Sequence, residues 1–481
     1  MAPQPPIAPP QRPAPPFRPT PRVAAGVWGG GVRMVPWGWL EWTILSQTLL
    51  PALLFVPGMS AVRIVTRVGV YAIALLAWVA LLIKGRRPPG GGHPSTPWLL
   101  AASVWLVLSL ANPGLNSPAS GLAQIVVNLA ILAPAFWGAS ALISRRQVGR
   151  VMAILLLCNS ASALMGIGQV LRPNTFNPPD IRFIEGMTDA ENQSYEGANG
   201  QMIMRPCGLT DSPGIGASSA GLMAALLGVG WTLRPMATWK RLGSLGLAMA
   251  GLILIYFSQV RVMLLILVGS LATLMGLMAV QRQFRKLTQM GAACALIFVA
   301  SLAWVASVGG EGALARFQEL LEEDPTKTFD KNRGNFLTHT FAVIVPDYPL
   351  GAGLGRWGPM HAYFGDKRIS RERGQIWVEI QITGWAVDGG VPLMVVYVVA
   401  LGFALYDLGR IALRSRDPDI AYWAAVVFAL DLGIVVSSLG MPTFVIPLGL
   451  QFWVLAAAVS AADHLVPVSA GMRRPLFPAS P

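Results

Sequence analysis

The chain has 481 residues, of which 54% are hydrophobic and 12% are charged, and its formal net charge is +13. This composition excludes an ordinary soluble protein and indicates an integral membrane protein. In a soluble protein the positive charge would suggest nucleic-acid binding. Here the basic residues lie in short connections between apolar segments, where they orient a chain in a membrane.

Residues 1–36 form a proline-rich tail. Its first 22 residues contain ten prolines, with Arg12, Arg18 and Arg22 among them. Such a segment cannot form a helix, so we expect disorder or an extended polyproline II conformation. It is not a signal peptide, because the apolar run that follows lacks a small-residue cleavage pattern. We interpret it as a plain cytoplasmic tail. A docking site for a proline-recognising partner is the alternative.

The sequence predicts an all-α integral membrane fold with about twelve spans, since a spanning helix needs about 20 mostly apolar residues. The first span contains Glu41 and the third is short. The expected organisation is transmembrane helices 1–9 in 37–308, helices 10–12 in 381–465, and a C-terminal tail at 466–481. The predicted spans lie near residues 38–57, 64–83, 97–112, 119–143, 151–171, 213–233, 243–260, 262–280, 288–308, 386–407, 420–440 and 443–463.

The basic residues predict the orientation. Five basic clusters all fall on one side of the predicted membrane, which the positive-inside rule makes the cytoplasm. Both termini are then cytoplasmic. Arg63 and Arg67 fall on the opposite face, against the rule, which indicates an anionic ligand there. The five clusters are Lys84–Arg87, Arg145–Arg150, Lys240–Arg241, Arg282–Lys286 and Arg410–Arg416.

The longest polar interruption is 309–380, on the outer face. We interpret it as an extracytoplasmic loop domain that forms a lid over a lipid-linked substrate. Within it, residues 333–346 predict an amphipathic helix, and Gly351–Gly355 predicts a flexible turn rather than a nucleotide-binding loop. Asp388, beyond it, is expected to cap the tenth span. The loop carries Arg316, Arg333, Arg356, Arg368, Arg371 and Arg373 together with Glu319, Glu322, Glu323, Asp324 and Asp330.

Two arginines are candidates for binding an anion. Arg261 lies at a tight turn between two apolar helices, in SQVRVMLL. A guanidinium there can hold a phosphate through two parallel hydrogen bonds, and an interfacial arginine that reaches toward headgroups is the alternative. Arg205 precedes a predicted helix start near Pro213, with Asp211 or Ser212 as the cap. A helix N-terminus beside an arginine favours anions, although a simple capped loop also fits.

Four segments, in order over about 170–465, resemble the O-antigen ligase and polymerase family of bacterial envelope glycosyltransferases. They are RPCGLTDSPGIGASSAG, SQVRVMLL, RGNFLTHTFAVIVPDYPLGAGLG and VEIQITGWAVDGGVPLMVVY. The resemblance implies a GT-C-type enzyme of the bacterial inner membrane. Such an enzyme transfers glycan from undecaprenyl pyrophosphate at the outer face to a glycan or lipid acceptor, without a metal or another cofactor. Arg205 and Arg261 would then stabilise the departing pyrophosphate.

The sequence departs from the family pattern at one position. Ligases of the family carry a His-Asn or similar pair about eleven residues before the final Gly. Counting back from Gly390 places Glu379 there, and a carboxylate can act as general base toward an acceptor hydroxyl. His339 and His361 are substitutes for the missing His, although a structural or surface role fits each. The loss of the His argues against a standard lipid A-core ligase and favours a polymerase or a divergent exopolysaccharide enzyme.

The substrate-binding candidates are therefore Arg63, Arg67, Arg333, Arg356, His339 and His361, beside the catalytic candidates Arg205, Arg261 and Glu379. The three cysteines show neither metal-binding nor disulfide spacing. A polytopic transporter or flippase of a lipid-linked or anionic substrate is the alternative function. The lack of correspondence between the two halves of the chain argues against it. A structural envelope protein would leave Arg205 and Arg261 unexplained.

Overall fold

The structure is a computed structural model that describes residues 36–85, 92–178, 194–196, 202–210, 212–322, 333–373 and 376–465. The predictions for the proline-rich tail, apart from Pro36, and for the C-terminal tail lie outside these residues.

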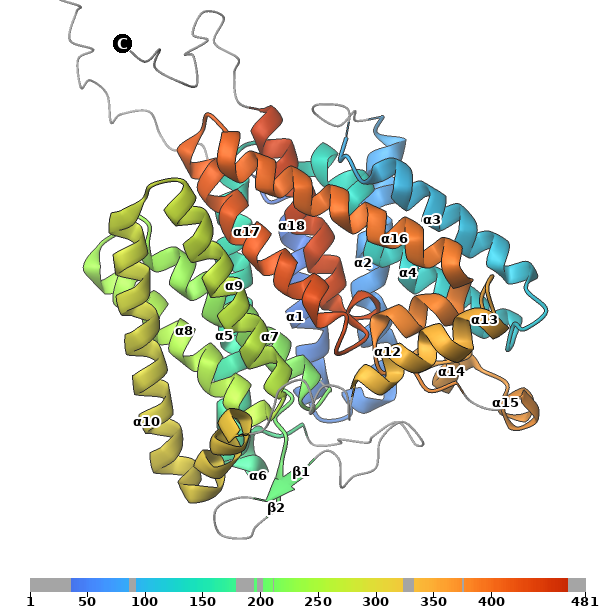
Figure 1. The fold of residues 1–481 in the computed structure, drawn as a ribbon, viewed down its shortest axis with the longest axis horizontal. Coiled ribbons are helices and arrows are strands. Elements are labelled where there is room, and N and C mark those ends of the chain that lie inside the picture. Colours follow the sequence, from blue (N-terminus) through green and yellow to red (C-terminus); the bar gives the residue numbers. More distant parts are fainter. Residues whose placement is uncertain are drawn as a thin grey trace, which may run out of the picture. The chain divides into compact units, whose positions relative to one another are not determined.

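A helix forms at each of the twelve predicted positions (Figure 1). The sequence specifies them through long apolar runs that can satisfy every backbone hydrogen bond internally. The helices are α1 (Trp39–Ala52), α2 (Arg63–Ile83), α3 (Thr96–Leu108), α4 (Pro118–Ala141), α5 (Arg146–Leu171), α7 (Ile215–Thr232), α8 (Thr238–Ser258), α9 (Arg261–Val280), α10 (Phe284–Glu322), α16 (Gln381–Arg414), α17 (Pro418–Ser437) and α18 (Pro447–His464).

Shorter elements fill the connections. One antiparallel hairpin pairs β1 with β2, with Ser194 opposite Met204. In Figure 1 this hairpin and the short helices α12 and α14 lie in the lower part of the view. The shorter elements are η1 (Leu53–Phe55), η2 (Met59–Val62), η4 (Ser109–Ala111), α6 (Pro173–Phe176), β1 (Ser194–Glu196), β2 (Met202–Met204), α12 (Asn335–His339), η7 (Thr340–Ile344), α13 (Val345–Asp347), α14 (Gly358–Phe364), α15 (Lys367–Arg373) and η8 (Thr443–Val445).

Nine helices in the described part of the chain are long and apolar enough to cross a membrane. They are α2, α4, α5, α7, α8, α9, α10, α16 and α17. Helices α1 and α3 have 14 and 13 residues, shorter than the membrane core requires, and together with α18 they fall outside this set. The protein is therefore a predominantly α-helical, multi-pass membrane protein.

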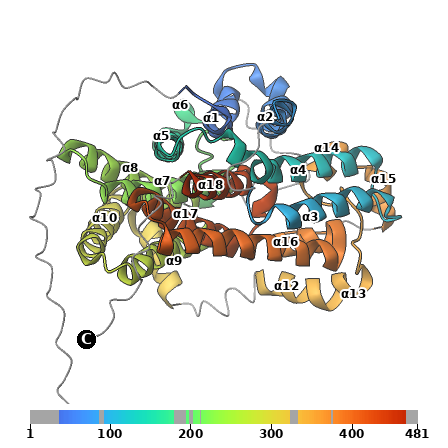
Figure 2. The ribbon, with the colours of Figure 1, turned by 90° about the horizontal axis from the view of Figure 1, so that it is seen from above.

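Helix α18 lies at the centre of the bundle. Seen from above, α7, α8, α9 and α10 lie on one side of it, and α3, α4 and α16 lie on the other (Figure 2). Most of its residues are buried, and it packs against α4, α16 and α17. A helix that is apolar all round fits such a position, because no face of it has to meet lipid headgroups or water.

Contacts between helix ends define two opposite ends of the bundle. At the first, the hydroxyl of Tyr71 near the start of α2 donates to Val445 in η8, and the amide of Gln381 at the start of α16 donates to Ser438 just after α17. We call this the loop end, because α14 also meets α2 there. At the second, which we call the tail end, the starts of α1, α5 and α17 meet the ends of α7 and α16 through the polar contacts described below.

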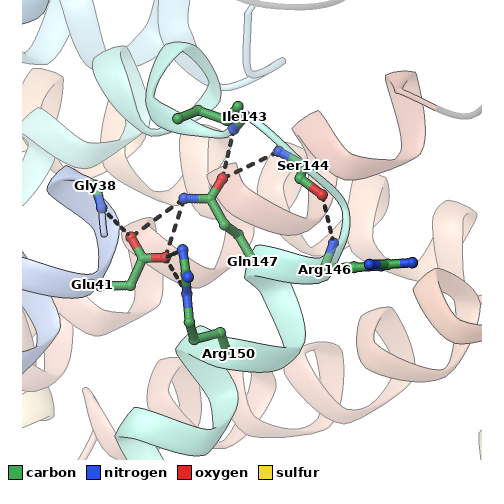
Figure 3. Close-up of polar contacts among 7 residues, drawn as sticks. All are labelled: Gly38, Glu41, Ile143, Ser144, Arg146, Gln147 and Arg150. Carbon is green, nitrogen blue, oxygen red and sulfur yellow. Dashed lines mark hydrogen bonds and ion pairs between the residues drawn. The ribbon is translucent and has the colours of Figure 1, made fainter. Parts of the chain in front are cut away.

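Glu41 shows how the tail end is held together. Its side chain is 0% exposed, inside the apolar segment of α1. The amide of Gly38 donates to it at 2.9 Å, Gln147 Nε2 donates at 3.1 Å, and Arg150 forms an ion pair with it (Figure 3). Gln147 in turn accepts from the amide of Ile143 at 2.6 Å. A buried carboxylate is tolerated here because its charge is matched and its oxygens are hydrogen-bonded.

Two helices are longer than the spans predicted within them. Helix α10 runs to Glu322, while its apolar part, Phe284–Val305, agrees with the span predicted near 288–308. Helix α16 begins at Gln381, and the kink at Gly390 divides it near the predicted start of the tenth span. Hydropathy marks where a segment is apolar, and it does not mark where a helix ends.

Candidate functional site

Arg261 is the first residue of α9, and two residues separate that helix from α8. The reversal uses Gln259, which has a left-handed φ of 57° and whose Nε2 donates to the carbonyl of Tyr256 at 2.9 Å. The predicted tight turn is therefore present. It leaves Arg261 half-buried at a helix N-terminus, where free backbone amides and the helix dipole favour an anion.

Gly214 lies beside both Arg205 and the residue that precedes Arg261. Its φ is +75°, and a β-carbon there would lie 3.6 Å from Cδ of Arg205 and 3.6 Å from Cγ2 of Val260. Arg205 and the residue that precedes Arg261 thus contact the same glycine. We predict that the guanidinium groups of Arg205 and Arg261 lie roughly 10–15 Å apart, so that both reach one pyrophosphate through contacts of about 3 Å each. This distance remains a prediction.

The predicted cap of α7 was wrong for Ser212. The helix begins at Ile215, and its N-cap is Gly214, which has no side chain to offer. The carbonyl of Ser212 accepts from the amide of Gly216 at 3.1 Å, so this residue contributes its backbone. Asp211, the other predicted cap, lies outside the described residues. Among the described residues, the amides of Ile215 and Gly216 at the start of α7 donate to the backbone carbonyls of Pro213 and Ser212.

Gln169 on α5 positions the segment that carries Arg205. Its Oε1 accepts from the amides of Cys207 and Gly208 at 2.8 and 3.0 Å, and its Nε2 donates to the carbonyl of Gly208 at 2.9 Å. Ser162 Oγ accepts from the amide of Leu209 at 3.0 Å. The sequence analysis missed Gln169, although a glutamine near the end of an apolar span was a usable signal.

The connection between α17 and α18 links the start of α9 to the start of α16. A β-carbon on Gly440 would lie 3.5 Å from Cγ2 of Val262, the residue that follows Arg261. Gln381 donates its amide to Ser438 at 2.9 Å and accepts from the amide of Phe444 at 2.7 Å. Glu379, two residues before Gln381, is therefore at the same end of the bundle as Arg261.

Glu379 forms an ion pair with Arg333, and Trp377 Nε1 donates to its Oε1 at 2.7 Å. The two side chains are 28% and 39% exposed, so the pair is open to water on one side. Burial lowers the pKa of Arg333 from its ordinary value. The carboxylate is thus held in place by two donors while remaining accessible. A general base needs such a position, and a plain counter-ion would also have it.

The two basic residues of α2 lie at the loop end. Arg67 Nη1 donates to the hydroxyl of Tyr363 on α14 at 3.1 Å. Arg63 begins α2 and is half-buried, and its carbonyl accepts from Thr66 Oγ1 at 2.9 Å. On the predicted orientation, Arg63 and Arg67 lie at the outer face, where positive charge is unusual. The arrangement therefore fits the predicted anionic ligand. Their role as ligand-binding residues stays a prediction.

The remaining candidates divide into two groups. Arg356 is 6% exposed and donates to the carbonyl of Ala352 at 3.2 Å, and Nδ1 of His361 lies 3.0 Å from the carbonyl of Gly355. These contacts give both side chains a part in holding the 351–357 segment. His339 ends α12 with its side chain exposed, away from the contacts that hold the 351–357 segment.

The expectations for Gly351–Gly355 and for Asp388 were wrong. The glycine-rich turn is fully buried, and a β-carbon on Gly353 would lie 2.3 Å from the carbonyl of Gly114. Asp388 lies inside α16 rather than capping it. It is buried and accepts from Trp357 Nε1 at 2.8 Å and from Gln124 Nε2 at 3.0 Å. Asp388 therefore fastens the loop to the bundle, a role that the sequence analysis missed.

Gly390 divides α16 into two helical segments that meet at a kink. Its φ is 67°, and a β-carbon there would lie 2.2 Å from the carbonyl of Pro349, so only glycine fits. The amide of Val391 donates to the same carbonyl at 2.9 Å. The loop thus satisfies a backbone group at the start of the second segment, where Pro392 cannot donate a hydrogen bond.

The loop end gathers positive charge from separate parts of the chain. Arg63, Arg67, Arg205, Arg261 and Arg333 all lie there, with Glu379 among them. Such a site can bind a multiply charged anion and can present one carboxylate to a polar partner. Among the described residues, no group of His, Cys, Asp or Glu is placed to hold a metal ion.

Comparison with known proteins finds no family model that matches the chain and no curated protein similar to it. The fold defines a class, a polytopic α-helical membrane protein, and the arginine candidates lie at one end of its bundle.

Proposed function

We propose that the protein is a glycosyltransferase at the outer face of the bacterial inner membrane. It transfers or polymerises glycan from an undecaprenyl-pyrophosphate-linked oligosaccharide. The observation that carries this proposal is the meeting of Arg205 and the start of α9 at Gly214. Arg205 and Val260, the residue before Arg261, both lie beside Gly214, so the chain brings the backbone of the two arginine segments close together, as a site for a departing pyrophosphate would need.

In this reaction an acceptor hydroxyl attacks the anomeric carbon of the donor glycan. The new bond joins that carbon to the acceptor oxygen, and the bond to the pyrophosphate oxygen breaks. Undecaprenyl pyrophosphate leaves with an additional negative charge, which Arg205 and Arg261 neutralise. Glu379 takes the proton of the acceptor hydroxyl. Arg333 holds the carboxylate in place beforehand, and Arg63 and Arg67 bind anionic parts of the donor.

The proposal includes a topology of twelve membrane crossings in a GT-C-type bundle, with the loop end outward and both termini in the cytoplasm. The tail end supports this orientation through its basic residues, among them Arg145, Arg234 and Arg410. Helices α1 and α3 then cross as short helices extended by η1 and η4, which directly follow them.

The test is a transfer assay with the purified chain and an undecaprenyl-pyrophosphate-linked oligosaccharide. Consumption of the donor with release of undecaprenyl pyrophosphate is expected. A ladder of products identifies a polymerase, which the absent His favours, and a single transfer identifies a ligase. Full retention of the donor under conditions that preserve the fold refutes the proposal.

One observation favours the alternative, a transporter or flippase. Asp431 in α17 is buried, and within the described part of the chain neither of its carboxylate oxygens has a hydrogen-bond partner. Carboxylic acids inside membrane helices commonly serve proton or ion pathways. Reconstituted vesicles separate the two functions, because a flippase moves the intact lipid-linked glycan across the bilayer and a glycosyltransferase consumes it.

A further inference from the structure

At the tail end, two cations from different helices flank one aromatic cluster. The guanidinium of Arg234, just after α7, lies 5.3 Å from the ring centre of Trp231 and 5.0 Å from that of Trp423. The Nζ of Lys286, in the first turn of α10, lies 4.8 Å from the ring centre of Tyr422. The rings of Tyr422 and Trp423 contact each other, with centroids 5.5 Å apart. We call these five residues the basic-aromatic cluster.

The basic-aromatic cluster has many hydrogen-bond donors and few acceptors. Arg234 Nη2 meets Asp419 Oδ1 at 3.4 Å, and the side chain of Asp419 is 74% exposed. Within the part of the chain that the structure describes, the ammonium of Lys286 makes no hydrogen bond, and the buried Nε1 of Trp231 has no acceptor. These donors are complementary to an anion with several oxygens.

Other cations of the tail end are matched by carboxylates. Arg145 pairs with Asp417, which also caps α17 by accepting from the amides of Asp419 and Ile420. Arg410 pairs with Asp407 at 2.6 Å. Together with the Arg150–Glu41 pair, these contacts neutralise three of the neighbouring cations. The basic-aromatic cluster, in contrast, holds two cations against one carboxylate, Asp419, which is largely exposed.

Helix α5 borders the basic-aromatic cluster with a glycine. At Gly149 a β-carbon would lie 3.8 Å from Trp423 Nε1 and 4.0 Å from Arg234 Nη1. Nearby, Phe284 at the start of α10 is 62% exposed. Tryptophan and tyrosine rings combined with cations and an exposed apolar side chain are typical of the headgroup level of a bilayer.

From these observations we infer that the basic-aromatic cluster binds the phosphate of an anionic phospholipid headgroup, in the leaflet at the tail end. Arg234 and Lys286 hold the phosphate oxygens, and the lipid's acyl chains lie along the apolar surface near Phe284. Basic pockets between membrane helices recognise anionic headgroups through the same chemistry. This site is at the opposite end of the bundle from the proposed glycan chemistry and does not depend on it.

The test is lipid binding to the purified full chain in detergent, measured by native mass spectrometry. Cardiolipin and phosphatidylglycerol are titrated against phosphatidylcholine. The double variant Arg234→Gln with Lys286→Gln should weaken cardiolipin binding by roughly thirtyfold, the product of two contributions of about fivefold for each cation at a membrane surface. The matched control is Lys240→Gln with Arg241→Gln, because Lys240 also lies over an aromatic ring, Trp239, at 5.3 Å.

The control should change cardiolipin binding by less than about threefold, as expected for exposed cations that contribute only to the general surface charge. Asp419→Asn gives a result that misfolding cannot produce, since removing the competing carboxylate should strengthen binding several-fold. Equal losses in both double variants, or no gain from Asp419→Asn, would overturn the inference. So would saturation of the site by millimolar inorganic phosphate, which would identify a free anion as the ligand.

Discussion

The ion pair between Glu379 and Arg333 allows a test that separates a catalytic base from a structural counter-ion. Glu379→Gln keeps the shape and the hydrogen bond from Trp377 Nε1 but cannot take a proton. Because the pair is 28% and 39% exposed, its loss should cost about 1 kcal/mol of stability or less. If Glu379 is the base, glycan transfer should fall by about 10²-fold or more, the scale of general-base catalysis. Binding of the lipid-linked donor should stay the same.

Arg333→Gln is the matched partner variant. It breaks the same ion pair but leaves the carboxylate and its hydrogen bond from Trp377 in place, so the loss of transfer should stay below about tenfold. Both variants are assayed by single-turnover transfer and by donor binding. Similar losses in the two variants would mean that Glu379 acts as the counter-ion of Arg333, and the general-base role would be refuted.

Three further predictions follow from the structure. Arg261→Lys keeps the charge at the start of α9 but loses the fork that holds two phosphate oxygens, so transfer should fall by about 10²-fold with unchanged membrane insertion; normal polymer in cells would remove Arg261 from the mechanism. Gln169→Leu should release the Arg205 segment from α5 and weaken donor binding by roughly tenfold, while donor binding at the wild-type level would show that Gln169 does not position that segment. Reporter fusions at Gly355 and at the C-terminus should report opposite sides of the membrane, and the same side for both would break the proposed topology.

Apolar length was enough to predict the positions of the twelve helices. Each predicted segment overlaps a helix, because a long apolar run in this composition has few other ways to satisfy its backbone. Helix ends were less accessible, since they depend on polar contacts that hydropathy does not register. The start of α16 illustrates this, as Gln381 is fixed by Ser438 and Phe444, residues more than fifty positions away in the sequence.

At the candidate site, sequence reasoning likewise identified residues by their type and missed those whose role depends on contacts with distant residues. Sequence reasoning selected Arg205 and Arg261 because arginine at a turn between apolar helices is costly without a function. It did not select Gln169, because a glutamine near the end of an apolar span marks an unusual position but does not reveal its three hydrogen bonds to the backbone 38 and 39 residues away. Nor could it predict the contacts of Asp388. In sequence, Asp-Gly-Gly-Val-Pro resembles a helix start, and a helical segment does begin after the kink at Gly390, but nothing local shows that Asp388 accepts from Trp357 and Gln124.

The contacts of Asp388 also connect the loop to the proposed chemistry. Asp388 joins Trp357 of the loop to Gln124 of α4, and the same turn of α16 receives Ala352 through the carbonyl of Val387 at 2.8 Å. The 351–357 segment is therefore anchored on two helices rather than free to swing. Closure over a bound donor would then have to come from other parts of the loop. Glu379 lies between the anchored 351–357 segment and the start of α9. The position of that segment therefore influences the position of the Glu379 carboxylate relative to Arg261.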